Sequence, residues 1–593
     1  MKIVLANCVG IDGAGWYIIP YPSRWTTSAK GHSDAFTYYP RDLGYLSSLL
    51  KRDTGHEIKL VDACLTRMDK EDYAKLIAGE KPDWLLMESS TRTINEDMWV
   101  ARAVKAATGA KVAMTGQHPT TYPRSVEGVC DLVIKGEYLK PALEFFRNGA
   151  KTPASGVIEF DRGNLIDVDE LPLPEDGDIS RLAYAMKGDP ICRYREAQVY
   201  ASRGCPYRCV YCVACHTYYG GPDYRARNAD SVVAELDMLF TKYPSLEGAF
   251  FDDEIHNANI ARTKKLARAI TAAGLDGKRY DAMCAYQNFD REALELMKRA
   301  GYYQVRVGVE TASDTVAQGL QLGAKYRPDK LNSFLDTAKE IGLGVYATFT
   351  LGGPGATAEE DGKTVKLMRQ LIESDLISDC QVSICTPQPG TPFYDWALEA
   401  GALVDRGWED FDGGVSSVID LPGYTGGQIE SVRLDALHAY DEARKTRDGR
   451  VFYDNWDKSV KTAGIAPKRP LLFRSSRDWH IEMCLNAVRQ SWTEAEVGFL
   501  CHEGHRAGFE NNRPWLKILP YGREGFLSVD GLDGSLLDNI ARFAPDTAFI
   551  PSNSYHCRGY GNVLEVAERL SIRDVYFINS AGEIIPARRS QAR

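Results

Sequence analysis

Four cysteines of this 593-residue chain lie within eleven residues, in the string SRGCPYRCVYCVAC. The spacing Cys205-x3-Cys209-x2-Cys212 places three thiolates on one short loop. Three thiolates cannot complete a four-iron cluster, because each iron needs an outside ligand, and one iron is then left open to bind a substrate or cofactor. A structural zinc site would need a second cysteine pair at a distance. A redox CxxC made by Cys212 and Cys215 would leave the first spacing unexplained.

The cysteine loop follows a predicted strand that opens a series of strand and helix units. Helical patterns such as 231–243 and 291–301 separate the strands. Six such units predict an open or partial (β/α)6 barrel over residues 195–405, with chemistry at the carboxyl ends of the strands. The predicted strands are 198–204, 248–254, 280–286, 304–310, 344–350 and 380–386.

Strands and helices also alternate before and after this barrel. Residues 1–150 predict a parallel sheet covered on both faces, and ligands bind at the carboxyl ends of such strands. Residues 468–593 predict a small Rossmann-like domain. A polar linker at 151–194 and a mainly helical connector at 406–467 separate the units. The predicted fold class is therefore α/β, with three units along the chain.

Composition narrows the functional class. The chain has 71 Lys+Arg and 81 Asp+Glu, a net charge of −10, which argues against a general nucleic-acid binder. No apolar run reaches the ~18 residues that span a bilayer, and the first residues lack a signal-peptide pattern. The 14 cysteines are too sparse for a disulfide scaffold. We therefore expect a soluble, cytoplasmic protein.

The string CPYRCVYC resembles the CxxxCxxC motif of the radical S-adenosylmethionine (SAM) superfamily. Further along, AFFDDEIHN, RVGVETAS, FTLGGPGATAEED and CTPQPGTPFYDW resemble other conserved segments of that family, in the same order. The resemblance implies a [4Fe-4S] cluster on Cys205, Cys209 and Cys212, whose open iron binds SAM. Cys215 departs from the motif and is an inert neighbour, a rival ligand or a reactive thiol, of which we favour the first. The SAM contacts implied are Tyr211, Asp252, Asp253, Gly308 and Glu310.

Residues 37–63, TYYPRDLGYLSSLLKRDTGHEIKLVDA, resemble the opening of a cobalamin-binding domain that precedes the core in one radical SAM subfamily. LMESSTRTINEDMW, MTGQHPTTYPRSV and DLVIKGE resemble its later turns. Residues 7–17 lack the D-x-H-x-x-G string that supplies a histidine to cobalt in other cobalamin folds. A turn histidine bonded to backbone is an alternative role for His118. The cobalamin contacts implied are Ser89, Ser90, Thr91, Gly116, Gln117, His118 and Glu137.

This pair of domains implies methylation of an unactivated carbon. One SAM would methylate cobalamin, and a second would yield the 5′-deoxyadenosyl radical that takes hydrogen from the substrate. The alternatives are oxidation, cyclisation or rearrangement with the same cofactors, a methylthiotransferase with a second cluster on Cys8, Cys64 and Cys130, and a non-catalytic sensor.

The expected partners are a small-molecule or biosynthetic-intermediate substrate and a reductant such as flavodoxin or ferredoxin. Neither nucleic acid nor a membrane span is expected. For the domain at 468–593 we expect a role in recognising or capping the substrate.

Overall fold

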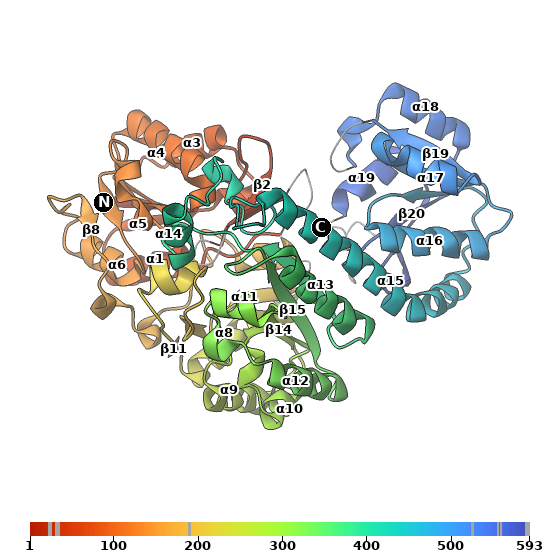
Figure 1. Ribbon diagram of the computed structural model, residues 1–593. Helices are drawn as coiled ribbons and strands as arrows, with labels where there is room; N and C mark the ends of the chain where they lie inside the picture. The colour runs from red at the N-terminus through yellow and green to blue at the C-terminus, as the bar shows by residue number, and fades with distance from the viewer. Residues whose placement is uncertain are drawn as a thin grey trace.

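Three six-stranded sheets organise the described part of the chain, and each belongs to one α/β unit (Figure 1). The predicted fold class is confirmed. No helix among the described residues combines the length and the apolar character needed to cross a membrane. The computed structural model describes residues 1–21, 26–29, 36–187, 191–522, 527–553, 557 and 560–587.

The first sheet has the doubly wound order β4-β1-β5-β6-β7-β8, with all neighbours parallel. Its strand residues alternate between two cores, because successive side chains of a strand point to opposite faces. Helices α1 and α6 cover one face, and α3 and α4 cover the other. The strand order reverses between β1 and β5, the place where such sheets bind ligands.

The elements of this first unit are the strands β1 (Lys2–Ala6), β2 (Tyr17–Ile19), β3 (Thr27–Ala29), β4 (Glu57–Val61), β5 (Trp84–Glu88), β6 (Lys111–Thr115), β7 (Leu132–Ile134) and β8 (Val157–Ile158), and the helices α1 (Arg41–Asp53), α2 (Ala63–Thr66), α3 (Lys70–Gly79), α4 (Ile94–Thr108), α5 (Gln117–Thr121) and α6 (Leu139–Arg147).

The second sheet has the order β16-β15-β14-β13-β12-β9, all parallel, and forms an open barrel. Val305, Val307 and Val309 of β14 pack outward against the helices. The alternate residues of β14, among them Arg306 and Glu310, therefore face the inside of the barrel.

The elements of the barrel are the strands β9 (Glu196–Val199), β10 (Ser202–Arg203), β11 (Arg225–Ala226), β12 (Gly248–Phe251), β13 (Arg279–Cys284), β14 (Gln304–Glu310), β15 (Gly344–Leu351) and β16 (Asp379–Ile384), and the helices α8 (Ala229–Lys242), α9 (Ile260–Ala272), α10 (Arg291–Arg299), α11 (Asp314–Gly319), α12 (Pro328–Glu340), α13 (Ala358–Glu373) and α14 (Pro392–Glu399).

Helix α15 (Gly426–Ala463) joins the barrel to the third unit (Figure 1). Its 38 residues span about 57 Å. Thr425 begins the helix with a capping box to Gln428. The helix packs on α13 and then on α16, so one continuous element carries the C-terminal domain.

The third sheet has the order β19-β18-β17-β20-β21-β22, in which only the β21–β22 pair is antiparallel among the described strands. Its elements are the strands β17 (Pro470–Phe473), β18 (Val497–His502), β19 (Leu516–Tyr521), β20 (Thr547–Pro551), β21 (Asp574–Ile578) and β22 (Ile584–Pro586), and the helices α16 (Asp478–Ser491), α17 (Arg506–Asn512), α18 (Gly534–Phe543) and α19 (Gly561–Arg569).

The segment 151–194, which we expected to be a linker, does more than connect two units. It contributes β8 to the edge of the first sheet and contains α7 (Arg181–Lys187). Arg181 forms an ion pair with Glu235 of α8 at 2.7 Å, with both side chains almost fully buried. The segment therefore fixes the first unit against the barrel.

Candidate active site

The three motif cysteines lie on a loop between β10 and a short π-helix at Ala214–Tyr218. Gly204, which opens the loop, has φ of +86°, and a Cβ there would lie 2.7 Å from the Asp223 carbonyl oxygen. The Val210 N–H donates to the Leu320 carbonyl at 3.1 Å. The loop is thus held from both sides, and its backbone presents the cysteines at the carboxyl end of the barrel.

The cysteine thiols form a partly buried group. Cys209 is buried, and Cys205 and Cys212 are half-buried. Burial and the neighbouring Cys212 sulfur raise the pKa of Cys205, and burial raises the pKa of Cys209 to about 11. Three thiolates here therefore require a positively charged partner, which an iron–sulfur cluster supplies, so the residues fit that group.

Glu310 and Lys325 place a buried pair of opposite charges beside the cysteines. The Lys325 ammonium donates to Glu310 Oε1, and the Thr350 hydroxyl donates to Oε2 at 2.9 Å. Glu310 has φ of +66°, a strained conformation of the kind found at functional sites. A Cβ at Gly308 would lie 2.2 Å from Glu310 Oε1, so glycine leaves room for that carboxylate. Burial and then the Glu310 charge raise the pKa of Tyr211.

The two aspartates predicted to face SAM have different environments. Asp252, at the end of β12, accepts a hydrogen bond from Gln198 Nε2 at 2.9 Å, inside the barrel. Asp253 accepts from the Ala201 N–H at 2.7 Å and contacts His256 Nδ1 at 2.6 Å, and it is fully buried. These contacts commit Asp253 to holding the start of the cysteine loop. Its contact with SAM stays a prediction that this geometry does not favour.

Two loops at the carboxyl edge of the first sheet carry most of the residues predicted to contact cobalamin. Ser89, Ser90 and Thr91 follow β5, and Gly116 and Gln117 follow β6. The loops lie side by side because β5 and β6 are parallel neighbours. Gly116 has φ of +98°, and a Cβ there would lie 2.3 Å from the Ser89 carbonyl oxygen. Only glycine permits this close approach.

The loop after β5 is buried and polar. The Ser89 hydroxyl donates to Asp97 at 2.5 Å, and burial raises the pKa of Asp97 to about 7. The Thr91 hydroxyl oxygen is buried and has no hydrogen-bond partner in the described part of the chain. A buried hydroxyl of this kind fits a hydrogen-bonding nucleotide tail, so the loop suits cobalamin.

The loop after β6 reaches the barrel. Gln117 Nε2 donates to Gln388 Oε1 at 2.9 Å, in the segment that resembles the end of the radical SAM core. His118 Nε2 lies 3.1 Å from the Ser125 hydroxyl, and its ring packs edge-on against Trp408. Burial lowers the pKa of His118 to about 4, which keeps the ring neutral. His118 is thus a turn histidine that bonds to a side chain rather than to backbone, and its contact with cobalamin stays a prediction.

Glu137 belongs to the contact between the first unit and the barrel. Its carboxylate accepts from Arg203 Nε at 2.7 Å, from Arg225 Nη2 at 2.9 Å and from the Ile166 N–H at 3.0 Å. Both oxygens are therefore occupied by protein donors. Its predicted contact with cobalamin stays a prediction, and the structure adds an interdomain role.

The carboxyl ends of the first sheet face the carboxyl end of the barrel. A cavity of about 30 Å³ between them is lined by Asn7 after β1, Glu88 at the end of β5 and Tyr200 after β9, among others. Burial and then the Asp42 charge raise the pKa of Glu88 to about 8. The cavity therefore marks where the first unit meets the barrel, and the residues predicted to contact the cluster, SAM and cobalamin lie outside its lining.

Comparison with known proteins agrees with this geometry. Residues 199–368 match the model of the radical SAM superfamily, and residues 31–144 match that of the B12 binding domain. The chain belongs to the cobalamin-dependent radical SAM enzymes. Membership carries the cofactors of the family, namely SAM with a [4Fe-4S] cluster in the barrel and cobalamin in the first unit.

Individual relatives of this enzyme carry methyltransferase names. An uncharacterized methyltransferase of Pyrococcus horikoshii is 28% identical over 418 residues, 68% of this chain and 87% of the relative. Cytidylyl-2-hydroxyethylphosphonate methyltransferase of Streptomyces wedmorensis is 24% identical over 53% of this chain and 69% of its own length. The solved methyltransferase TsrM of Kitasatospora setae, with cobalamin and a [4Fe-4S] cluster, shares the fold at TM-score 0.54 and 19% identity, over 68% of this chain and 79% of its own.

The structure also removes one alternative for this enzyme. Cys8 follows β1, and its sulfur lies 3.8 Å from the Cys64 sulfur, whereas Cys130 precedes β7. Residues after and before the strands of a parallel sheet lie at opposite edges. These three cysteines therefore cannot hold one additional cluster, as the methylthiotransferase alternative would require.

Sequence reasoning missed two residues of the site, Lys325 and Arg203. Lys325 ends a short 3-10 turn after α11, in a stretch without a motif that we had identified. Arg203 lies directly before the cysteine loop, in SRGC, where only its proximity to the motif could have drawn attention.

Proposed function

We propose that this enzyme transfers a methyl group to an unactivated carbon of a small-molecule substrate. The observation that carries the proposal is that the loops of the B12-binding unit and of the radical SAM barrel meet across direct contacts. Gln117 bonds to Gln388, and Arg41 pairs with Glu254 at 2.9 Å. The methyltransferase names of the relatives support the same outcome.

When bound, the cluster and SAM supply a radical that takes hydrogen from carbon, and cobalamin supplies the methyl group. The protein's own residues hold and orient these groups. The Lys325 ammonium and the Glu310 carboxylate form a pair matched to the carboxylate and amino groups of an amino acid. Lys325 and Glu310 are 13% and 9% exposed, so these charges act with little screening by water.

Isotope labelling tests the proposal. The enzyme is purified anaerobically with cobalamin and incubated with a strong reductant, candidate substrates and SAM that carries a deuterated methyl group. We expect product heavier by one labelled methyl group, with S-adenosylhomocysteine and 5′-deoxyadenosine formed together. Product without the label, alongside 5′-deoxyadenosine, would show oxidation, cyclisation or rearrangement instead and would contradict methyl transfer.

Lys325→Met tests the proposed SAM contact. Loss of one charge-assisted hydrogen bond, on the order of 1.5–3 kcal/mol, should weaken SAM binding about tenfold to a hundredfold. Lys325→Arg should restore part of it, while the cluster absorbance stays unchanged. Lys330→Met, a half-buried neighbour that donates to the Gln287 carbonyl, is the matched control. Equal SAM affinity in wild type and Lys325→Met would refute this role.

We also infer a small reductant of the flavodoxin or ferredoxin type as partner, and a role for the C-terminal domain in recognising the substrate. Uncoupled cleavage of SAM in the presence of a reduced flavodoxin or ferredoxin, at a rate above that of the protein alone, tests the first. Variants at the carboxyl ends of β17 and β20 test the role of the C-terminal domain. They should change turnover of substrate without changing uncoupled SAM cleavage.

A further inference from the structure

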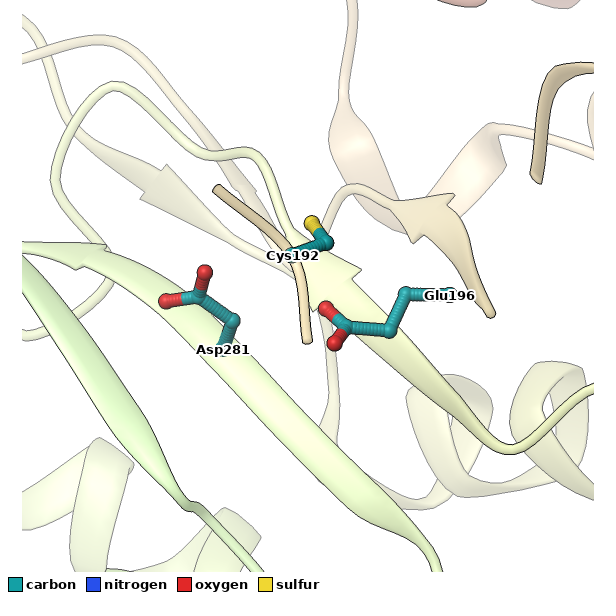
Figure 2. A group of neighbouring side chains, drawn as sticks. All are labelled: Cys192, Glu196 and Asp281. Atoms are coloured by element: carbon teal, nitrogen blue, oxygen red, sulfur yellow. The ribbon is translucent and has the colours of Figure 1, made fainter. Parts of the chain in front are cut away.

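A second group of metal-type ligands lies near the amino ends of the barrel strands, away from the cysteine loop. Cys192 precedes β9, Glu196 begins β9, and Asp281 lies on β13. Strands β9 and β13 both pair with β12, so their side chains meet across one strand. One ligand atom from each residue lies within 4.8 Å of the other two (Figure 2).

The environment of Glu196 indicates that this group is a binding site for a cation or a donor. The residue is 5% exposed, and its Oε1 accepts a hydrogen bond from the Tyr303 hydroxyl at 2.7 Å. Its Oε2 is buried and accepts no hydrogen bond within the residues that the structure describes. Figure 2 shows the carboxylate directed toward Asp281. A buried carboxylate oxygen is costly to leave without a donor or a cation.

The surrounding donors orient the other two ligands. Arg306 Nε donates to Asp281 Oδ2 at 2.6 Å, and its Nη2 donates to the Cys192 sulfur at 3.1 Å. Gln304 Nε2 also donates to Asp281 Oδ2, at 3.0 Å. Groups that donate to the ligands of a metal fix their direction in this way. The Cys192 sulfur thus already has a donor that directs it, and a cysteine binds metal as the thiolate.

An ion can reach the group from solvent. A cavity of about 240 Å³ is lined by Cys192 and Gln304 from the barrel, Arg447 from α15 and Ser580 from the loop after β21, among other residues. The cavity lies between the barrel and the C-terminal domain and reaches Cys192, whereas Glu196 and Asp281 are not part of its lining. A smaller cavity of about 20 Å³, lined by Cys192 and Glu196 among other residues, has room for one water molecule at a fourth position of coordination.

We propose that Cys192, Glu196 and Asp281 bind one zinc ion. One sulfur and two carboxylate oxygens suit zinc, whereas magnesium and calcium prefer oxygen alone. A water molecule from the cavity completes the tetrahedron. The zinc ties the segment before β9 to β13 and closes the amino end of the barrel. The proposal does not depend on the proposed function, because it uses none of the residues that bind the cluster, SAM or cobalamin.

The competing state holds protons in place of the metal. Burial and then the Asp281 charge raise the pKa of Glu196 to about 8 even with the Arg306 guanidinium nearby, so its carboxyl group keeps a proton at neutral pH when no metal ion is bound. A thiol at Cys192 and a carboxylic acid at Glu196 would neutralise the group as a divalent cation does. Zinc binding displaces both protons to solvent.

Metal analysis separates the two states. The full chain is produced with Cys205, Cys209 and Cys212 all changed to serine and without cobalamin, so that zinc cannot enter the cluster site and no cofactor absorbs light. After incubation with zinc chloride and gel filtration, we expect about one zinc per chain. Replacement of zinc by cobalt(II) should give a sulfur-to-cobalt charge-transfer band in the near ultraviolet.

Variants in that background assign the site. Cys192→Ser and the isosteric Glu196→Gln should each lower the zinc content at least tenfold, whereas Cys130→Ser, a half-buried cysteine of the first unit, should not change it. Circular dichroism and the elution volume verify that each variant is folded, and Glu196→Gln decides if Cys192→Ser does not fold. Less than about 0.1 zinc per chain in the parent, or zinc unchanged by Glu196→Gln and Cys192→Ser, overturns the proposal in favour of the protonated state.

Discussion

The two outer α/β units attach to the barrel in different ways. The first unit contacts it directly through buried charges, since Arg203 of β10 pairs with Asp42 of α1 and with Glu137, both at 2.7 Å, and all three side chains are at most 6% exposed. The third unit is carried by α15, where Arg477 pairs with Asp441 at 2.7 Å with both side chains partly exposed. The B12-binding unit therefore has a defined position over the barrel, and the pair that joins the third unit to α15 is the more exposed of the two contacts.

The largest effect should come from Arg203→Met. The change leaves Asp42 and Glu137 buried without one of their cations, and breaking a buried ion pair in this way costs about 3–5 kcal/mol. We expect hydrogen exchange at α1 and at the loop after β7 to accelerate and formation of 5′-deoxyadenosine to fall sharply. Unchanged exchange and activity would mean that the buried charges do not fix the first unit.

The second-largest effect should be a pH dependence of stability that differs between the first and the third unit. Asp97 in the first unit has a pKa raised by burial to about 7, so its contribution to stability is present at low pH and is lost as the pH rises from about 4 to about 7. His480 in the third unit has a pKa lowered by burial to about 3, so its contribution is present above about 6.5 and is lost as the pH falls toward 3.

Asp97→Asn should therefore stabilise the first sheet by on the order of 2 kcal/mol at pH 8 and by much less at pH 4. His480→Gln should benefit the third sheet more at pH 5 than at pH 8. Hydrogen exchange corrected for the intrinsic rate at each pH measures both units in one protein. Glu71→Gln, on the exposed first turn of α3, is the control. The same pH trend for both variants would contradict the assignment.

The smallest effect should come from Arg477→Met. A partly exposed ion pair contributes about 0–1 kcal/mol, so exchange in α16 and SAM cleavage should change little. A destabilisation as large as that of Arg203→Met would show that the third unit is fixed as firmly as the first.

Much of the fold follows from the sequence because parallel strands buried on both faces are continuous apolar runs. Five of the six barrel strands were expected within three residues of their observed bounds, for example 304–310 for β14, whereas β9 ends at Val199 and not at 204. Strand β8 was not expected, since it has two residues and lies in a polar segment. Its pairing with β7 comes from tertiary context and leaves no local pattern.

The motifs located the candidate site but did not give the direction of each side chain. Asp252 and Asp253 are adjacent, yet one faces the barrel interior and the other holds the backbone at Ala201. Arg203 and Asp42 are 161 residues apart in sequence, so no local pattern connects them. Such contacts depend on how the units meet, and only the folded chain shows them.

The central claim is that one chain holds a radical SAM cluster and a cobalamin together. The most direct measurement compares anaerobically purified wild type and Cys205→Ala. It determines the iron and cobalamin bound per chain and the 5′-deoxyadenosine that each protein forms from SAM. We predict about four irons and one cobalamin per wild-type chain, with 5′-deoxyadenosine formed from SAM. In Cys205→Ala, cluster and 5′-deoxyadenosine should be lost while cobalamin is retained. About eight irons per chain, no bound cobalamin, or undiminished SAM cleavage by the variant would contradict the account.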